Sequence, residues 1–160
     1  MFSEAERPAE VEPPSTVTVD DASCAARVDR IMAMAHLPAT AHVALIGHYT
    51  LPSLLALLRR GCSAVRCLRP GAPSPDCEAA DLAWIVDVQS DQELDEALRA
   101  ARARVGATGR VVVEGTGCVC RTGLASIRDR AVAAGLDVVS FDHNANRVVL
   151  AMQPRLAMAA

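Results

Sequence analysis

Side chains with the potential for chemistry gather in three short stretches, and each stretch follows a run of apolar residues. In the first, Gly47-His48-Tyr49-Thr50, His48 could act as a general base, and Tyr49 could stack on a ligand or hydrogen-bond to it. The second stretch contains Asp87, whose carboxylate could orient a substrate or bind a ligand amine. The alternatives are that His48 only caps a turn, that Tyr49 packs on a sheet edge, and that Asp87 caps a neighbouring backbone.

The third stretch is the glycine-rich segment 115–123, with the sequence GTGCVCRTG. The amides of Gly115 and Gly117, the guanidinium of Arg121 and the start of a following helix could together hold an anion. The alternative is a flexible loop without a ligand.

Six cysteines are irregularly spaced, which is typical of small buried side chains kept reduced in a cytosolic protein. Cys118 and Cys120 stand one residue apart and could form a soft-metal or redox pair. A metal site needs more ligands, however, and the sequence has no C-x-x-C motif. We therefore expect no metal, with both cysteines incidental to their loop.

Composition excludes several classes of function. Aromatic residues make up only 2% of the 160 residues and the net charge is −3, so neither base stacking nor attraction to nucleic acid is expected. Every basic residue is arginine, which excludes Schiff-base and P-loop lysine chemistry. No apolar run reaches membrane-spanning length, and residues 1–18 are acidic and proline-bearing, unlike a secretory signal. We expect a cytoplasmic protein without a membrane or nucleic-acid partner.

Charge is distributed in two blocks. Five arginines and no acid occur from Arg30 to Pro75, whereas eight acids and no base occur from Asp76 to Glu96. Such segregation is typical of a polar seam or a surface for a partner. The alternative is that the first block is mostly buried and the second is exposed.

Apolar periodicity and turn residues predict ten elements between residues 22 and 152. In chain order they are helix 22–35, strand 41–46, a helix after Thr50, strand 63–68, strand 83–88, a helix after Ser90, strand 110–114, helix 123–134, and strands 136–141 and 147–152.

The helix after Thr50 has signals at both ends. Thr50 is the expected N-cap, Pro52 falls in the first turn, and Gly61 supplies a left-handed stop. The leucines of this helix are expected to form a wide buried face: Leu51, Leu54, Leu55, Leu57 and Leu58.

The helix after Ser90 opens with Ser90-Asp91-Gln92-Glu93, which matches a capping box. In this motif the serine and the glutamate are each expected to accept from the other's backbone amide. The helix is expected to end at Gly106, after burying Leu94, Ala97, Leu98, Ala101 and Val105.

Alternation of helices and strands predicts an α/β fold with a doubly wound, mostly parallel sheet in a three-layer αβα arrangement. The last two strands are joined by a connection too short for a crossover, so they should form an antiparallel hairpin, with His143 as a solvated turn residue. We expect one Rossmann-like domain over residues 22–154, a flexible acidic arm over residues 1–21 and a tail over residues 155–160.

Four segments carry a resemblance to the class I S-adenosylmethionine-dependent methyltransferases. They are the segments HVALIG (42–47), DLAWIVDV (81–88), RVVVEG (110–115) and the terminal hairpin (137–152). The resemblance implies the fold of that family and S-adenosylmethionine as the possible cofactor. It also implies a ligand site built from Gly47, His48, Tyr49, Thr50, Asp87, Gly115, Gly117 and Arg121.

The chain departs from this family in three ways. The first loop lacks the family's alternating glycines after Gly47, so side chains would crowd a bound cofactor. The acid that should contact ribose hydroxyls is missing, and Arg69 stands near its place, where a phosphorylated nucleotide is conceivable. One helix–strand pair of the family is also expected to be missing between residues 68 and 81. These departures indicate a shortened, degenerate member.

Two functions follow from this combination. The first is a non-catalytic methyltransferase-like domain that binds a small ligand or a protein partner, including a second copy of itself, with a regulatory role. The second is an active small-molecule methyltransferase with an atypical glycine loop, in which His48, Tyr49 and Asp87 are the catalytic candidates. A third option is another Rossmann-like protein that binds an anion with segment 115–122.

Overall fold

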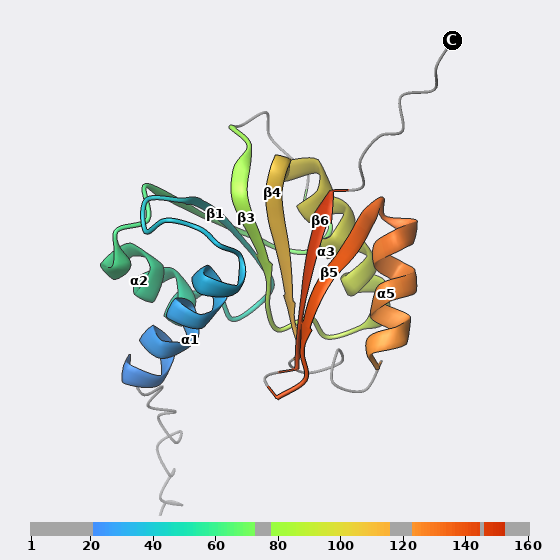
Figure 1. Ribbon diagram of the computed structural model, residues 1–160, viewed down its shortest axis with the longest axis horizontal. Helices are drawn as coiled ribbons and strands as arrows, with labels where there is room; N and C mark the ends of the chain where they lie inside the picture. The colour runs from blue at the N-terminus through green and yellow to red at the C-terminus, as the bar shows by residue number, and fades with distance from the viewer. Residues whose placement is uncertain (1–20, 73–77, 116–122, 145, 153–160) are drawn as a thin grey trace, which may run out of the picture.

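The computed structural model describes residues 21–72, 78–115, 123–144 and 146–152 (Figure 1). The predicted tail and all of the predicted arm except Asp21 lie outside these residues. Asp21 itself opens the first helix.

The order and type of all ten predicted elements are confirmed. They are α1 (Asp21–Met34), β1 (His42–Ile46), α2 (Leu51–Arg60), β2 (Ala64–Leu68), β3 (Ala80–Ile85), α3 (Asp91–Arg104), β4 (Val105–Glu114), α5 (Leu124–Ala133), β5 (Leu136–Asp142) and β6 (Arg147–Met152).

The strands form one sheet in the order β2-β1-β3-β4-β6-β5. Strands β2, β1, β3 and β4 are parallel, whereas β6 runs antiparallel to both β4 and β5. The predicted doubly wound sheet with a terminal hairpin is therefore confirmed. Because the chain moves from β1 outward to β2 and then returns to β3 on the other side, the strand order reverses between β1 and β3. Ligands of open α/β sheets bind beside such a reversal, beyond the carboxyl ends of the strands.

Helices cover both faces of the sheet (Figure 1). Alternate residues of each central strand point to opposite faces, so Leu45, Trp84 and Val112 pack beneath α1 and α2. Ile46, Ile85 and Val113 pack beneath α3 and α5. Two apolar cores on one sheet make the predicted three-layer architecture.

Helix α2 differs most from its prediction. Leu57 is buried and Leu54 is half-buried, but Leu51, Leu55 and Leu58 are 62%, 44% and 50% exposed. The prediction of one wide buried face is wrong, because α2 packs at the end of the sheet on α1 and β2, and no described element covers its outer side. Of the two predicted end signals of α2, the one at its carboxyl end is confirmed. Gly61 is left-handed at φ 96°, whereas Thr50 occupies the N-cap position without a capping bond from its side chain.

Helix α3 confirms one half of its capping box. Ser90 Oγ accepts from the amide of Glu93 at 3.2 Å. The Glu93 carboxylate accepts from the amide of Gln89 at 2.8 Å, one residue before the expected partner.

The predicted stop of α3 at Gly106 is wrong. Val105 is already extended, at φ −78° and ψ 138°, and it begins β4, so Gly106 lies within a strand. Strand β3 also begins earlier and ends earlier than predicted. It ends at Ile85 because Asp87, at φ 47°, turns the chain into the left-handed region.

Candidate functional site at the carboxyl end of the sheet

Gly47 follows β1 at the point where the strand order reverses, and its backbone is closely packed there. Its N–H donates to Leu68 O at 2.9 Å, while the N–H of Val86 donates to Ile46 O at 2.9 Å. An added Cβ on Gly47 would lie 1.8 Å from Val86 O, and the residue has φ 153°. Glycine is needed here so that the ends of β1, β2 and β3 can meet, and its amide is engaged within the sheet.

His48 reaches across this end of the sheet to the start of α3. Its Nε2 lies 3.2 Å from both carboxylate oxygens of Glu93. The pKa of Glu93 lies below its ordinary value. The main cause is the hydrogen bond from the Gln89 amide, and the hydrogen bond and charge of His48 contribute less. His48 therefore joins the loop after β1 to the helix after β3. His48 therefore does more than cap a turn, which was the alternative that the sequence left open.

Tyr49 is 79% exposed, so it does not pack on the sheet edge. Its ring is open to solvent between the His48 loop and α2. Thr50 is half-buried at the start of α2.

Asp87 is half-buried, with its backbone in the left-handed region at φ 47°. Its Oδ1 accepts from the side-chain amide of Gln89 at 3.1 Å. Asp87 thus contacts Gln89 within the short connection from β3 into α3, and His48 contacts Glu93 in the first turn of α3. A non-glycine residue held in this backbone conformation is strained, and such strain is frequent at functional sites.

Gly115 is buried at the end of β4. Its N–H donates to Asn146 O at 2.7 Å, and Asn146 Nδ2 donates to Gly115 O at 3.1 Å. An added Cβ would lie 1.9 Å from Asn146 Nδ2, so a side chain at this position would clash with the hairpin turn. The remaining candidates of the glycine-rich segment, namely Gly117, Cys118, Cys120 and Arg121, lie outside the described residues.

A buried charge cluster next to Gly115 was not anticipated from the sequence. Glu114, the last residue of β4, accepts from Arg147 Nη2 at 2.7 Å and from Arg27 Nε at 2.8 Å. Arg27 Nη2 donates to the same carboxylate. Trp84 Nε1 also donates to it at 3.3 Å, and the Arg27 guanidinium lies 5.1 Å from the Trp84 ring centroid. We call Glu114, Arg27, Arg147 and Trp84 the Glu114 cluster.

Burial opposes ionisation of Glu114, but hydrogen bonds and charges from Arg27 and Arg147 outweigh it. The pKa of Glu114 therefore lies below its ordinary value. One signal in the sequence could have revealed the pair with β6. An acid ends the apolar run RVVVE and an arginine begins the next strand of the hairpin, and these two residues face each other in the sheet as Glu114 and Arg147.

The resemblance implies that S-adenosylmethionine would bind at the carboxyl end of the sheet, but the described residues there do not fit this cofactor. The amide of Gly47 is bonded within the sheet, and the space beside its Cα is filled by Val86 O. Strand β2 ends at Leu68 and is followed by Arg69, so no carboxylate stands there for ribose hydroxyls. The ion pair of His48 with Glu93 also spans the region beyond β1 and β3.

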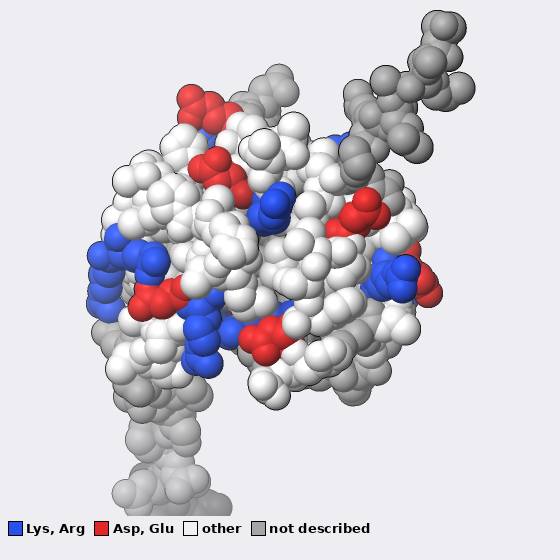
Figure 2. Space-filling model, viewed as in Figure 1, with Lys and Arg blue, Asp and Glu red and all other residues white. Residues whose placement is uncertain are grey.

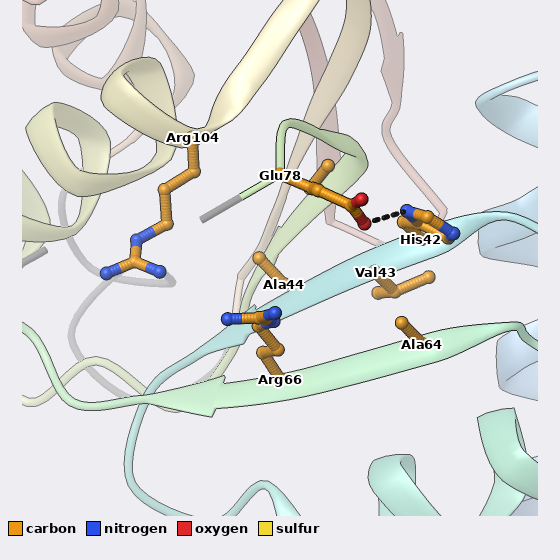
Figure 3. Close-up of a pocket in the computed structure, with 8 residues that line it drawn as sticks. His42, Val43, Ala44, Ala64, Arg66, Glu78 and Arg104 are labelled. Atoms are coloured by element: carbon orange, nitrogen blue, oxygen red, sulfur yellow. Dashed lines mark ion pairs between the residues drawn. The ribbon is translucent and has the colours of Figure 1, made fainter. Parts of the chain in front are cut away.

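A small hollow of about 30 Å³ lies at the opposite, amino end of the parallel strands (Figure 3). Its lining includes Arg66 and Arg104, together with His42 and Glu78, whose Nδ1 and Oε2 atoms are 4.0 Å apart. Its size suits a water molecule, and it lies away from the carboxyl end where the sequence places its candidates.

Several solved structures of methyltransferases share this architecture. The sugar N-methyltransferase KedS8 from a Streptoalloteichus species matches with a TM-score of 0.63 and 10% identity, over 96% of this chain and 100% of that one. The CcbJ methyltransferase from Streptomyces caelestis matches with a TM-score of 0.61 and 13% identity, over 84% and 93%. CalS10, an S-adenosylmethionine-bound amino pentose methyltransferase from Micromonospora echinaspora, matches with a TM-score of 0.53 and 14% identity, over 81% and 90%.

The sequence matches no protein-family model and no curated protein. The chain nevertheless has the class I S-adenosylmethionine-dependent methyltransferase fold, as the resemblance of its strands predicted.

Two further observations concern only the part of the chain that the structure describes. No three His, Cys, Asp or Glu side chains there gather closely enough to hold a metal ion. None of the described helices combines the length and the hydropathy needed to cross a lipid bilayer.

Proposed function

We propose that this methyltransferase-like domain is non-catalytic and acts by binding a ligand or a protein partner. The observation that carries the proposal is the closed backbone packing at Gly47, where the amide is bonded to Leu68 O and Val86 O occupies the side-chain position. A cofactor that depends on a glycine loop needs this backbone to be open to it. The ion pair of His48 with Glu93 supports the proposal, since it holds the next residue of the loop against α3.

The alternative function is that of an active small-molecule methyltransferase. One observation favours it: Asp87 keeps a left-handed backbone at the carboxyl end of the sheet, close in sequence to the exposed start of α3. In that case His48, Tyr49 and Asp87 would serve the reaction, and S-adenosylmethionine would have to approach without amide contacts from Gly47.

Calorimetric titration of the full chain with S-adenosylmethionine and S-adenosylhomocysteine distinguishes the two functions. We expect no binding heat at ligand concentrations of several hundred micromolar. A dissociation constant in the micromolar range would contradict the proposal and support the alternative. In that event His48→Ala should weaken binding, whereas His143→Ala should not, because His143 is an exposed turn residue stacked on Phe141 in the hairpin.

A further inference from the structure

The outer side of α2 carries the largest group of exposed apolar side chains. Seven large hydrophobic residues are exposed in the described part of the chain, and four of them are Tyr49, Leu51, Leu55 and Leu58. The three leucines recur at the i, i+4, i+7 spacing of a single helical stripe, and Tyr49 lies just before Thr50, the N-cap residue of the helix. We call these four residues and Arg59 the α2 face. A contiguous apolar stripe on a helix is typical of a binding surface.

A groove lies beside this stripe, between α1 and α2. Its apolar lining is Ala25, Val28 and Ala56, and its volume is about 210 Å³, enough for one large apolar side chain. Arg59 and Arg60 line its rim, with Asp29 of α1 paired to Arg60. A stripe next to a groove is the arrangement that binds amphipathic helices, which anchor one side chain in a groove and pack others along it.

The charge of this region selects the kind of helix that would bind. Helix α2 contains no acid and ends in Arg59-Arg60, and the one acid that lines the groove, Asp29 of α1, is already paired to Arg60. Figure 2 shows basic side chains over the area of α1 and α2, at the left of the view, with acidic side chains among them. A second copy of the chain would set one acid-free, arginine-bearing helix against another. A helix carrying carboxylates would instead be attracted.

The sheet topology also explains why no described element covers the outer side of α2. Strand β2 is the last strand on this side of the sheet, and the described residues of the connection from β2 to β3 contain no helix that could cover α2. This is where the sequence predicts that a helix–strand pair is missing relative to the methyltransferases that it resembles.

From these observations we propose that the α2 face and the α1–α2 groove bind an amphipathic helix of a partner protein. Its apolar side chains would pack on Leu51, Leu55 and Leu58, and its carboxylates would pair with Arg59. This inference rests on the proposed function, because it names the partner of a domain that acts by binding.

The test uses two synthetic helical peptides of equal length with the same leucine stripe. One carries glutamates beside the stripe, and the other carries arginines at the same positions. The fluorescence anisotropy of each labelled peptide is followed during titration with the full chain. We expect the glutamate peptide to bind at least about tenfold more tightly than the arginine peptide, which corresponds to about 1.4 kcal/mol.

Three variants place the binding. Leu55→Glu should lower the affinity for the glutamate peptide by about tenfold or more. Arg59→Glu should make the chain bind the arginine peptide more tightly than the glutamate peptide. Val139→Glu is the matched control, because Val139 is also an exposed apolar residue and lies on β5, at the opposite edge of the sheet. It should leave both affinities unchanged. Circular dichroism checks that each variant is folded.

Several outcomes would overturn the proposal. One is equal binding of the two peptides or no binding of either, and another is a preference that Arg59→Glu does not alter. If the chain sediments as a dimer that Leu55→Glu dissociates, the occupant is a second copy. If a peptide of residues 1–20 displaces the glutamate peptide, the occupant is the chain's own N-terminal segment. Binding of S-adenosylmethionine, measured separately, would refute the non-catalytic function without changing any of these readouts.

Discussion

Two charged clusters lie at the carboxyl end of the same sheet, and they differ in their access to water. The Glu114 cluster, at the end of β4, is buried between α1 and β6, with one carboxylate shared by two guanidinium groups. The ion pair of His48 with Glu93, beyond β1 and β3, is partly open to solvent. Burial makes the first cluster indispensable to the fold, because removing one partner would leave charges without compensation. Because the second cluster is partly exposed, substitutions in it should change the free energy of unfolding only slightly.

The largest effect should come from removing the buried carboxylate. Glu114→Ala leaves Arg27 and Arg147 facing each other, and it should lower the free energy of unfolding by about 3–5 kcal/mol. Chemical denaturation monitored by Trp84 fluorescence measures the change. Glu93→Ala is the matched control at the exposed cluster and should cost clearly less. Equal losses in the two variants would show that burial does not separate the clusters.

A second test concerns the backbone beneath the exposed cluster. Gly47→Ala should destabilise the fold by about 3 kcal/mol, because its Cβ would overlap Val86 O in a backbone conformation that side chains rarely adopt. Gly61→Ala should cost only about 1 kcal/mol. Gly61 is also left-handed, but no atom lies within 4 Å of its added Cβ. Thermal unfolding of both variants, compared with the unchanged protein, gives the ranking. A tolerated Gly47→Ala would mean that the loop can open.

Acid should affect the buried cluster most. The pKa of Glu114 is lowered in the folded state, so the unfolded chain takes up a proton first as the pH falls below about 4.3. Stability from Glu114 is therefore fully present above that pH and is lost as the pH falls towards the folded pKa. Urea denaturation from pH 6 to pH 3 should show a falling midpoint. In Glu114→Gln this decline should be shallower, and an unchanged slope would assign the acid sensitivity to other groups.

The smallest effect is expected at the exposed pair. His48→Ala should leave the denaturation midpoint within experimental error, because partly exposed ion pairs contribute little to stability. Ser90→Ala, three residues before Glu93, should lower the free energy of unfolding by about 1 kcal/mol through loss of the helix cap. If His48→Ala proves the more costly of the two, the bridge from β1 to α3 is a structural element like the Glu114 cluster.

The sequence allowed the architecture to be predicted because each element carries its own signal. The apolar run of β1, the Ser90 cap of α3 and the glycine that stops α2 are local features whose physics does not depend on distant residues. Two predictions about helices were wrong, namely the wide buried face of α2 and the end of α3 at Gly106, because tertiary contacts determine both features. The leucines of α2 have the periodicity of a buried face, but burial depends on a neighbouring element that the described chain does not place there.

The placement of the candidate residues at one end of the sheet was predictable, but their contacts were not. Parallel strands with a reversal of order bring Gly47, Asp87 and Gly115 to one end of the sheet, and the structure places them there. The contact of His48 with Glu93 joins residues 45 positions apart, and that of Arg27 with Glu114 joins residues 87 apart. No local pattern encodes such pairings, because they depend on which elements finally pack side by side.

The position of β6 between β4 and β5 has a consequence for the order in which the chain can fold. During synthesis β5 leaves the ribosome before β6, yet its place in the sheet is one strand further out. In the final sheet β5 pairs with β6 and not with β4, so it can take its place only once β6 is available. Arg147, the first residue of β6, then completes the bonds to Glu114 that Arg27 began from the opposite end of the chain. A nascent chain that stops before Arg147 lacks this closure and leaves the edge of β4 open to pairing with other chains.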